Sequence, residues 1–278
     1  QYMIGVESSR VMRAAPRKAA ERVEASVPWD FSRKYAAVHH SGTISVENAR
    51  KRSKIGRVMK VETFETPQDA AKALAGEVAE LIRTRAAEGK NVVLGLATGA
   101  TPLPFYAELV RMHKEEGLSF ANVISFNLDE YSGLDRDHPE SYWYFMHTNL
   151  FNHIDIKPEN INLPSGTVKD DEIAAHCAAY EQKIKDCGGI DLQILGIGRT
   201  GHIGFNEPGS DDTTVTRQVH LDELTRSDAA PAFGGIENVP TTAITMGVAT
   251  IMGAREVALM AWGEKKASIV KKAVQGPV

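Results

Sequence analysis

The chain has 278 residues, 42% of them hydrophobic and 24% charged, which is enough to bury a substantial core in one large or two modest domains. A formal net charge of −4 lacks the basic excess typical of nucleic-acid-binding domains. No apolar run approaches the roughly 18 residues that a membrane helix requires. Arg10, Arg13 and Arg17 interrupt the first segment, so we expect neither membrane insertion nor a signal peptide.

Two cysteines, Cys177 and Cys187, lie ten residues apart in a segment with helical periodicity. Helical geometry separates such positions by about 15 Å, which is too far for a disulfide. The sequence contains no Cys/His spacing typical of a zinc site. We therefore expect two reduced thiols in a cytoplasmic protein without a bound metal.

Residues 1–58 differ from the rest of the chain because they mix charged and small residues and show little sustained periodicity. We interpret them as an N-terminal extension, helical near residues 17–27, with a solvated basic cluster at 50–54. A single folded domain is expected to occupy residues 59–278.

From residue 61 the pattern becomes regular. Thr66 and Pro67 provide an N-cap and a first helical residue for a helix that ends at Gly89, and residues 92–96 form a continuous apolar run typical of a buried strand. Pro102 opens the next helix. Further strands are predicted at 123–128, 192–195 and 257–261, and further helices at 139–149, 171–185 and 265–274, with a long loop region before residue 257. This alternation predicts a doubly wound α/β fold of the Rossmann-like kind, with a mainly parallel sheet and helices on both faces.

Ligands of such sheets bind beyond the carboxyl ends of the strands, so the loops there are the candidate sites. The first such loop contains Thr98, Gly99, Ala100 and Thr101 before a helix N-terminus. Backbone N–H groups, two hydroxyls and the helix dipole favour a phosphate, although a tight turn with capping threonines would have the same sequence. The loop lacks the lysine of a P-loop and the glycine pattern of a dinucleotide site.

The second loop carries two adjacent acids, Asp129 and Glu130, directly after a buried strand. A desolvated carboxylate at this edge has a raised pKa and can act as a base. Either acid could instead cap the next segment or pair with a basic residue.

The third loop, residues 196–208, has four glycines within nine residues and carries His202 and Glu207. Glycines permit close approach of the backbone to a ligand. An imidazole near a carboxylate is a common acid/base arrangement, in which the carboxylate fixes the tautomer. A structural histidine is the alternative.

Together these loops resemble those of the glucosamine-6-phosphate deaminase/isomerase family, which is related to 6-phosphogluconolactonase. The resemblance extends from about residue 61 to the end of the chain and rests on three blocks in order: LGLATGATP, FNLDEYSGLDRDHPESYWYFMHTNLF and GIGRTGHIGFNEP. The chain ends earlier than such domains usually do, so we expect a missing C-terminal segment.

The resemblance implies a hydrolase of amino sugar metabolism, within N-acetylglucosamine catabolism, that needs no organic cofactor. It would convert glucosamine 6-phosphate and water to fructose 6-phosphate and ammonia, and would act as a homo-oligomer. By position in the motifs, Asp129 would move a proton from C2 to C1, His202 would assist ring opening and Glu207 would hold His202. The loop at 98–101 and Lys266 would bind the phosphate.

Two positions depart from the family pattern. Thr200 stands where the family has an aspartate two residues before the histidine, and Ala230, Pro231 and Ala232 occupy the stretch before Phe233 where a phosphate-contacting arginine is usual. Arg226 is a candidate substitute. The alternatives are a 6-phosphogluconolactonase-like hydrolase, a non-catalytic sugar-phosphate sensor, and an isomerase acting on another amino sugar phosphate.

Overall fold

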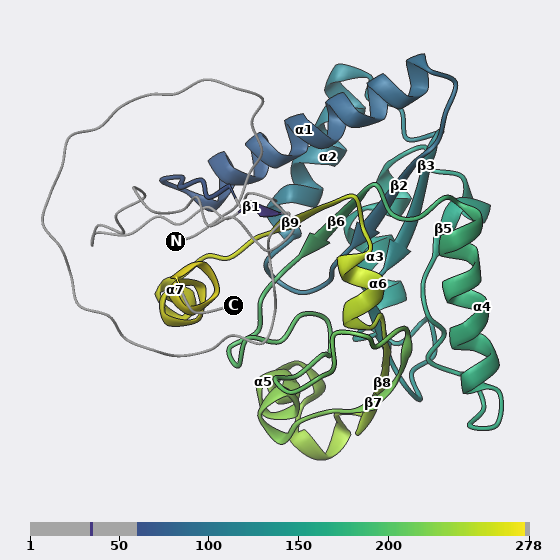
Figure 1. Ribbon diagram of the computed structural model, residues 1–278, viewed down its shortest axis with the longest axis vertical. Coiled ribbons are helices and arrows are strands. Elements are labelled where there is room, and N and C mark those ends of the chain that lie inside the picture. Colours follow the sequence, from purple (N-terminus) through teal and green to yellow (C-terminus); the bar gives the residue numbers. More distant parts are fainter. Residues whose placement is uncertain (1–33, 36–59, 276–278) are drawn as a thin grey trace, which may run out of the picture.

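The computed structural model describes residues 34–35 and 60–275 (Figure 1). Its centre is a parallel sheet of six strands in the order β1-β9-β6-β2-β3-β5. These strands are β1 (Lys34–Tyr35), β2 (Val92–Leu96), β3 (Val123–Asn127), β5 (Ile161–Asn162), β6 (Leu192–Leu195) and β9 (Glu256–Leu259). Helices surround the sheet, so the predicted α/β fold with a mainly parallel sheet is confirmed.

The principal helices are α1 (Pro67–Ala87), α2 (Leu103–Glu116), α3 (Tyr142–Asn149), α4 (Ile173–Asp186), α5 (Glu223–Phe233), α6 (Val248–Met252) and α7 (Ala267–Gln275). The start of α1 is as predicted, because the Thr66 hydroxyl accepts a hydrogen bond from the Asp69 amide at 3.1 Å and Pro67 takes the first helical position. Cys177 lies on α4 and Cys187 follows its last residue, and both are free thiols as expected.

Two residues of the proposed extension, Lys34 and Tyr35, pair with Val257 and Ala258 at the edge of the sheet. The helix expected near residues 17–27 and the basic cluster at 50–54 lie outside the described residues, so they stay predictions. None of the helices in the described part of the chain combines the length and apolarity that a membrane span requires.

The strand order reverses between β2 and β6. From β2 the chain runs outward through β3 to β5, and it then returns to place β6 and β9 on the other side of β2. Such a reversal leaves a crevice at the carboxyl ends of the two central strands. The loop at 98–101 follows β2 and the glycine-rich loop at 196–208 follows β6, so the topology brings two of the three candidate loops to this crevice.

A second sheet was not predicted. Strands β4 (Asp129–Tyr131), β8 (Thr242–Thr245) and β7 (Arg217–His220) form an antiparallel sheet in this order, at the bottom of Figure 1 beside α5. The expectation of a long loop before residue 257 is therefore wrong, because this region contains β7, α5, β8 and α6. Pro231 lies inside α5, where proline normally argues against a helix, and β7 and β8 are each only four residues long.

Candidate active site

Two of the predicted phosphate-binding residues, Thr101 and Lys266, lie at the start of the glycine-rich loop. The Thr101 side chain lies 3.8 Å from the position that a Cβ on Gly196 would occupy. Lys266, in the short helix η5 (Glu264–Lys266) before α7, donates a hydrogen bond from Nζ to the Ile197 carbonyl at 2.6 Å. Residues from the loops after β2 and β6 and from the segment before α7 thus come together at one end of the crevice.

The antiparallel sheet joins Asp129 to the same loop. Asp129 in β4 pairs with Thr245 in β8, and the Thr245 hydroxyl accepts a hydrogen bond from the Phe205 amide at 3.1 Å. A Cβ on Gly204 would lie 2.8 Å from the Thr245 hydroxyl and 3.3 Å from Oδ2 of Asp129. Only glycine leaves room for this approach, so the loop that carries His202 lies directly against the Asp129 carboxylate.

The adjacent acid Glu130 has a different environment. One of its carboxylate oxygens accepts hydrogen bonds from the amides of Tyr131 and Tyr142, at 2.9 and 3.0 Å, and the other accepts from the Trp143 amide at 2.9 Å. Tyr142 and Trp143 begin α3, so Glu130 caps that helix while the Ser141 hydroxyl accepts from the Tyr144 amide. This capping explains why α3 begins at Tyr142 and not at the predicted residue 139.

Asp129 is the acid that remains available for chemistry. Its residue is 5% exposed, and burial, followed by the negative charge of Glu130, raises its pKa well above the ordinary value. No hydrogen bond among the described residues engages its carboxylate. A buried carboxylate with a raised pKa is a stronger base than an exposed one, because its charged form is poorly solvated.

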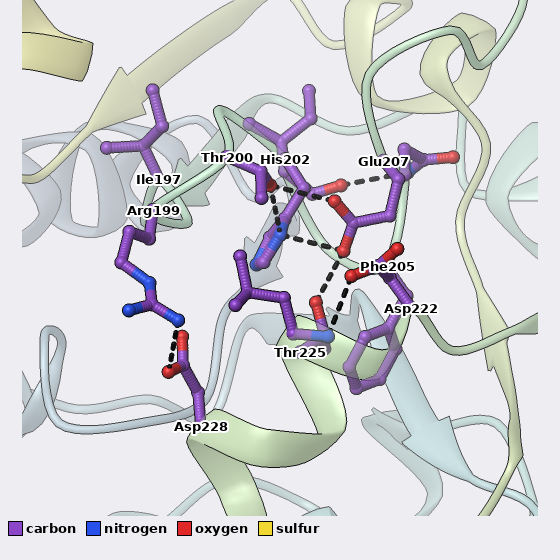
Figure 2. A network of polar contacts seen from close by, with 12 residues as sticks. Ile197, Arg199, Thr200, His202, Phe205, Glu207, Asp222, Thr225 and Asp228 are labelled. Carbon is purple, nitrogen blue, oxygen red and sulfur yellow. Dashed lines mark hydrogen bonds and ion pairs between the residues drawn. The ribbon is translucent and has the colours of Figure 1, made fainter.

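His202 and Glu207 form the centre of a polar network (Figure 2). Nδ1 of His202 lies 3.0 Å from Oε1 of Glu207 and 3.0 Å from the hydroxyl oxygen of Thr200. The Thr200 hydroxyl donates to Oε2 of Glu207 at 2.7 Å, and the Thr225 hydroxyl donates to Oε1 at 2.5 Å. Thr200 therefore bridges the imidazole and the carboxylate at the position where the family pattern has an aspartate.

This network fixes the histidine tautomer. Because the Thr200 proton is directed to Glu207, the Thr200 oxygen is free to accept, and Nδ1 faces two acceptors. The proton is therefore placed on Nδ1, and Nε2 of neutral His202 keeps a lone pair that can take a proton from a ligand.

Glu207 stays ionised in this setting. Burial acts to raise its pKa, but the hydrogen bonds from His202 and Thr225, the charge that His202 carries when it is protonated, and the hydrogen bond from Thr200 together lower the pKa to about 2. A permanent carboxylate beside Nδ1 stabilises the imidazolium that forms when Nε2 takes a proton.

Gly198 lies in close contact with the His202 imidazole. A Cβ on Gly198 would overlap the His202 ring, and the Gly198 amide donates to the His202 carbonyl at 2.8 Å. The glycine at this position is thus needed for space, and the loop is closed by its own backbone hydrogen bond.

Two residues of the site were missed at the sequence level. Thr225 lies on α5, in the region interpreted as loop, although Asp222 before Glu223 gives a helix N-cap signal. Tyr142 was predicted only as part of a helix, yet its ring centroid lies 5.0 Å from that of Tyr131, two residues after Asp129 in β4. Burial, then the charges of Tyr131 and Asp129, raise the pKa of Tyr142, so its hydroxyl stays protonated beside the loop at 98–101.

No group of three or more His, Cys, Asp or Glu side chains within residues 60–275 is arranged to hold a metal ion.

Comparison with known proteins identifies the class to which this fold and site belong. Residues 65–278 match the model of the family described as glucosamine-6-phosphate isomerases/6-phosphogluconolactonase. The chain belongs to this family.

Curated relatives carry deaminase names. The glucosamine-6-phosphate deaminase of Thermoanaerobacter sp. (strain X514) is 49% identical over 203 residues, which cover 73% of this chain and 79% of that protein. A putative glucosamine-6-phosphate deaminase-like protein of Bacteroides thetaiotaomicron is 47% identical over 234 residues. The match covers 84% of this chain but only 35% of that longer protein.

A solved deaminase structure is likewise more similar to this chain than a solved lactonase structure. A structure described as a monomeric glucosamine-6-phosphate deaminase has a TM-score of 0.73 and 41% identity, covering 77% of this chain and 87% of its own. The 6-phosphogluconolactonase of Trypanosoma brucei has a TM-score of 0.61 and 20% identity, covering 77% and 85%, which shows a shared fold alone. The lactonases are thus distant relatives and the deaminases close ones.

Proposed function

We propose that this chain is a glucosamine-6-phosphate deaminase that converts glucosamine 6-phosphate and water to fructose 6-phosphate and ammonia. The observation that carries the proposal is the placement of a buried, unengaged carboxylate, Asp129, against the loop that presents His202. Aldose–ketose conversion needs one base that reaches both C1 and C2, and ring opening needs a separate proton donor and acceptor. A lactonase would have no use for the first of these groups.

Ring opening is assigned to His202. Nε2 of the neutral imidazole takes the proton of the C1 hydroxyl as the C1–O5 bond breaks, and the resulting imidazolium returns a proton to O5. Glu207, ionised beside Nδ1, stabilises the imidazolium, and the hydroxyls of Thr200 and Thr225 hold Glu207 in place.

Proton transfer is assigned to Asp129. The carboxylate takes the C2 proton of the open-chain amino aldehyde while O1 gains a proton, which gives an enolamine. Asp129 then delivers the proton to C1, and loss of one N–H proton leaves a hydroxymethyl group at C1 and an imine at C2. Water then adds to C2, and the C2–N bond breaks to release ammonia and leave the ketone. The reaction consumes one water for each ammonia released, so it is a net hydrolysis.

The phosphate is assigned to the crevice between β2 and β6. Residues 98–101, with the hydroxyls of Thr98 and Thr101, lie just before the N-terminus of α2, and Lys266, which binds the Ile197 carbonyl in the loop after β6, would supply a positive charge. Binding the remote phosphate would orient C1 and C2 toward Asp129.

The proposal also includes a role in N-acetylglucosamine catabolism, a cytoplasmic location and assembly as a homo-oligomer. The family membership supports the metabolic role. The relative described as a monomer shows that the family includes monomeric enzymes, so sedimentation of the purified chain is the test of assembly.

The test of the function is a comparison of two substrates. Purified protein incubated with glucosamine 6-phosphate should release ammonia, while 6-phosphogluconolactone should be hydrolysed no faster than in buffer. Lactone hydrolysis without ammonia release would favour the lactonase. Binding of glucosamine 6-phosphate without turnover would favour the non-catalytic sensor.

A further inference from the structure

The phosphate end of the crevice contains a second cation that the family pattern does not predict. Lys266 is half-buried, and burial lowers its pKa, while the charge of Asp228 raises it and the charge of Arg199 lowers it. The Ile197 carbonyl accepts a hydrogen bond from Lys266, and Arg199 is only two residues further along the same loop. The loop therefore brings Arg199 to the same end of the crevice as Lys266.

Arg199 is held by a weak internal partner. Its Nη2 lies 2.8 Å from Oδ1 of Asp228, which joins the glycine-rich loop to α5 (Figure 2). The two side chains are 49% and 54% exposed. An ion pair this exposed contributes little stability, because water solvates both charges when they separate. A phosphate dianion, which carries more charge and accepts two parallel N–H donors, is a stronger partner for a guanidinium than one aspartate oxygen.

The other arginine near this position is already engaged. Arg226, the candidate substitute on α5, donates from Nη2 to the carbonyls of Ile236 and Val239 at 2.8 and 3.0 Å. These bonds tie Arg226 to the segment after α5. Residues 230–232 supply no cation. Arg226 is thus held by backbone carbonyls, whereas Arg199 has only an exposed carboxylate as its partner and lies in the loop whose Ile197 carbonyl binds Lys266.

We propose that Arg199 binds the substrate phosphate together with Lys266. In doing so, Arg199 gives up its ion pair with Asp228. Phosphate binding would then break the Arg199–Asp228 contact between the glycine-rich loop and α5, while the hydrogen bond from Thr225 to Glu207 keeps the two joined. This inference rests on the proposed function for the identity of the sugar phosphate, but its central claim concerns the phosphate alone.

The test is calorimetric titration of the full chain with inorganic phosphate and, separately, with glucosamine 6-phosphate. Arg199→Ala should weaken both affinities by about tenfold or more. Asp228→Asn should strengthen them severalfold, because it removes the competing anion. Arg83→Ala is the matched control, because Arg83 is also 49% exposed and pairs loosely with Glu116 at 3.9 Å on the helical surface. It should bind both ligands like the wild type.

Steady-state kinetics provide the second readout. Arg199→Ala should raise KM for glucosamine 6-phosphate with little change in kcat, since the residue binds a group remote from the reacting carbons. Unchanged phosphate affinity in Arg199→Ala, or weaker binding in Asp228→Asn, would overturn the inference. If the wild type binds phosphate through Arg199 but releases no ammonia, the proposed function fails while this inference stands. If the wild type releases ammonia and Arg199→Ala has the same KM as the wild type, the inference about Arg199 fails while the proposed function stands.

Discussion

The Thr200 hydroxyl donates a 2.7 Å hydrogen bond to Glu207, although Thr200 occupies the position of a carboxylate in the family pattern. The same oxygen lies 3.0 Å from Nδ1 of His202, so threonine links the two residues by hydrogen bonds where an aspartate would act by charge. Glu207 alone then provides the negative charge that stabilises the imidazolium.

Removing this hydroxyl should lower turnover without unfolding the protein. Thr200→Val keeps the shape of the side chain but leaves Glu207 and His202 each without one partner, so we expect kcat to fall about 10- to 100-fold, as for a lost hydrogen bond to a charged group. Thr200→Ser retains the hydroxyl and should stay within a few-fold of the wild type. Equal activity in the valine and serine variants, measured by ammonia release, would show that the bridge has no role.

Asp129→Asn should abolish turnover and stabilise the fold. Loss of a general base costs about 10²- to 10⁴-fold in kcat. The pKa of Asp129 is raised in the folded state, so its buried charge destabilises folding increasingly as the pH rises above the ordinary value of 3.8. At pH 7 the amide should therefore add about 1–2 kcal/mol to the free energy of unfolding, measured by urea denaturation. A less stable variant would contradict the assignment of Asp129 as a strained, functional carboxylate.

Glu130→Ala should have the opposite effect on stability. The substitution leaves the amides of Tyr131, Tyr142 and Trp143 without their acceptor at the start of α3. We expect the free energy of unfolding to fall by about 2–4 kcal/mol, with the same urea denaturation as the measurement. Full stability in Glu130→Ala would mean that other groups cap α3.

Gly198→Ala should displace the catalytic imidazole. The added Cβ would overlap the His202 ring, which must shift by about an ångström, and such a misplacement can cost about 100-fold in rate. Gly76→Ala on α1 is the control, because a Cβ there meets nothing within 4 Å. Ammonia release at wild-type rate by Gly198→Ala would contradict the assigned position of His202.

Glu207 should contribute to stability in a defined pH range. Its folded pKa of about 2 lies below the ordinary value of 4.5, so its contribution of about 3 kcal/mol is fully present above pH 4.5 and is lost as the pH falls toward 2. The difference in unfolding free energy between the wild type and Glu207→Gln should therefore shrink across this interval. A difference that stays constant would show that Glu207 is not ionised preferentially in the fold.

Much of the parallel sheet could be predicted, because its central strands are continuous apolar runs and α1 has its capping residues in sequence. The antiparallel sheet could not be predicted, since the side chains of the edge strand β7 alternate between half-buried and exposed and β8 is short. The helix α5 was missed because Pro231 lies inside it. The candidate residues at 98–101, Asp129, His202 and Glu207 could be predicted because they follow buried strands, whereas Lys266 was predicted only from the family resemblance. The separate roles of these residues could not be predicted, because only the folded structure shows that Glu130 caps α3 and that Thr225 is hydrogen-bonded to Glu207.

The most direct test of the account is simultaneous measurement of ammonia and fructose 6-phosphate during incubation of the wild type with glucosamine 6-phosphate, alongside His202→Ala and Asp129→Asn. The account predicts one fructose 6-phosphate for each ammonia in the wild type and neither product above background in the two variants. No products from the wild type, or both products from Asp129→Asn at the wild-type rate, would contradict it.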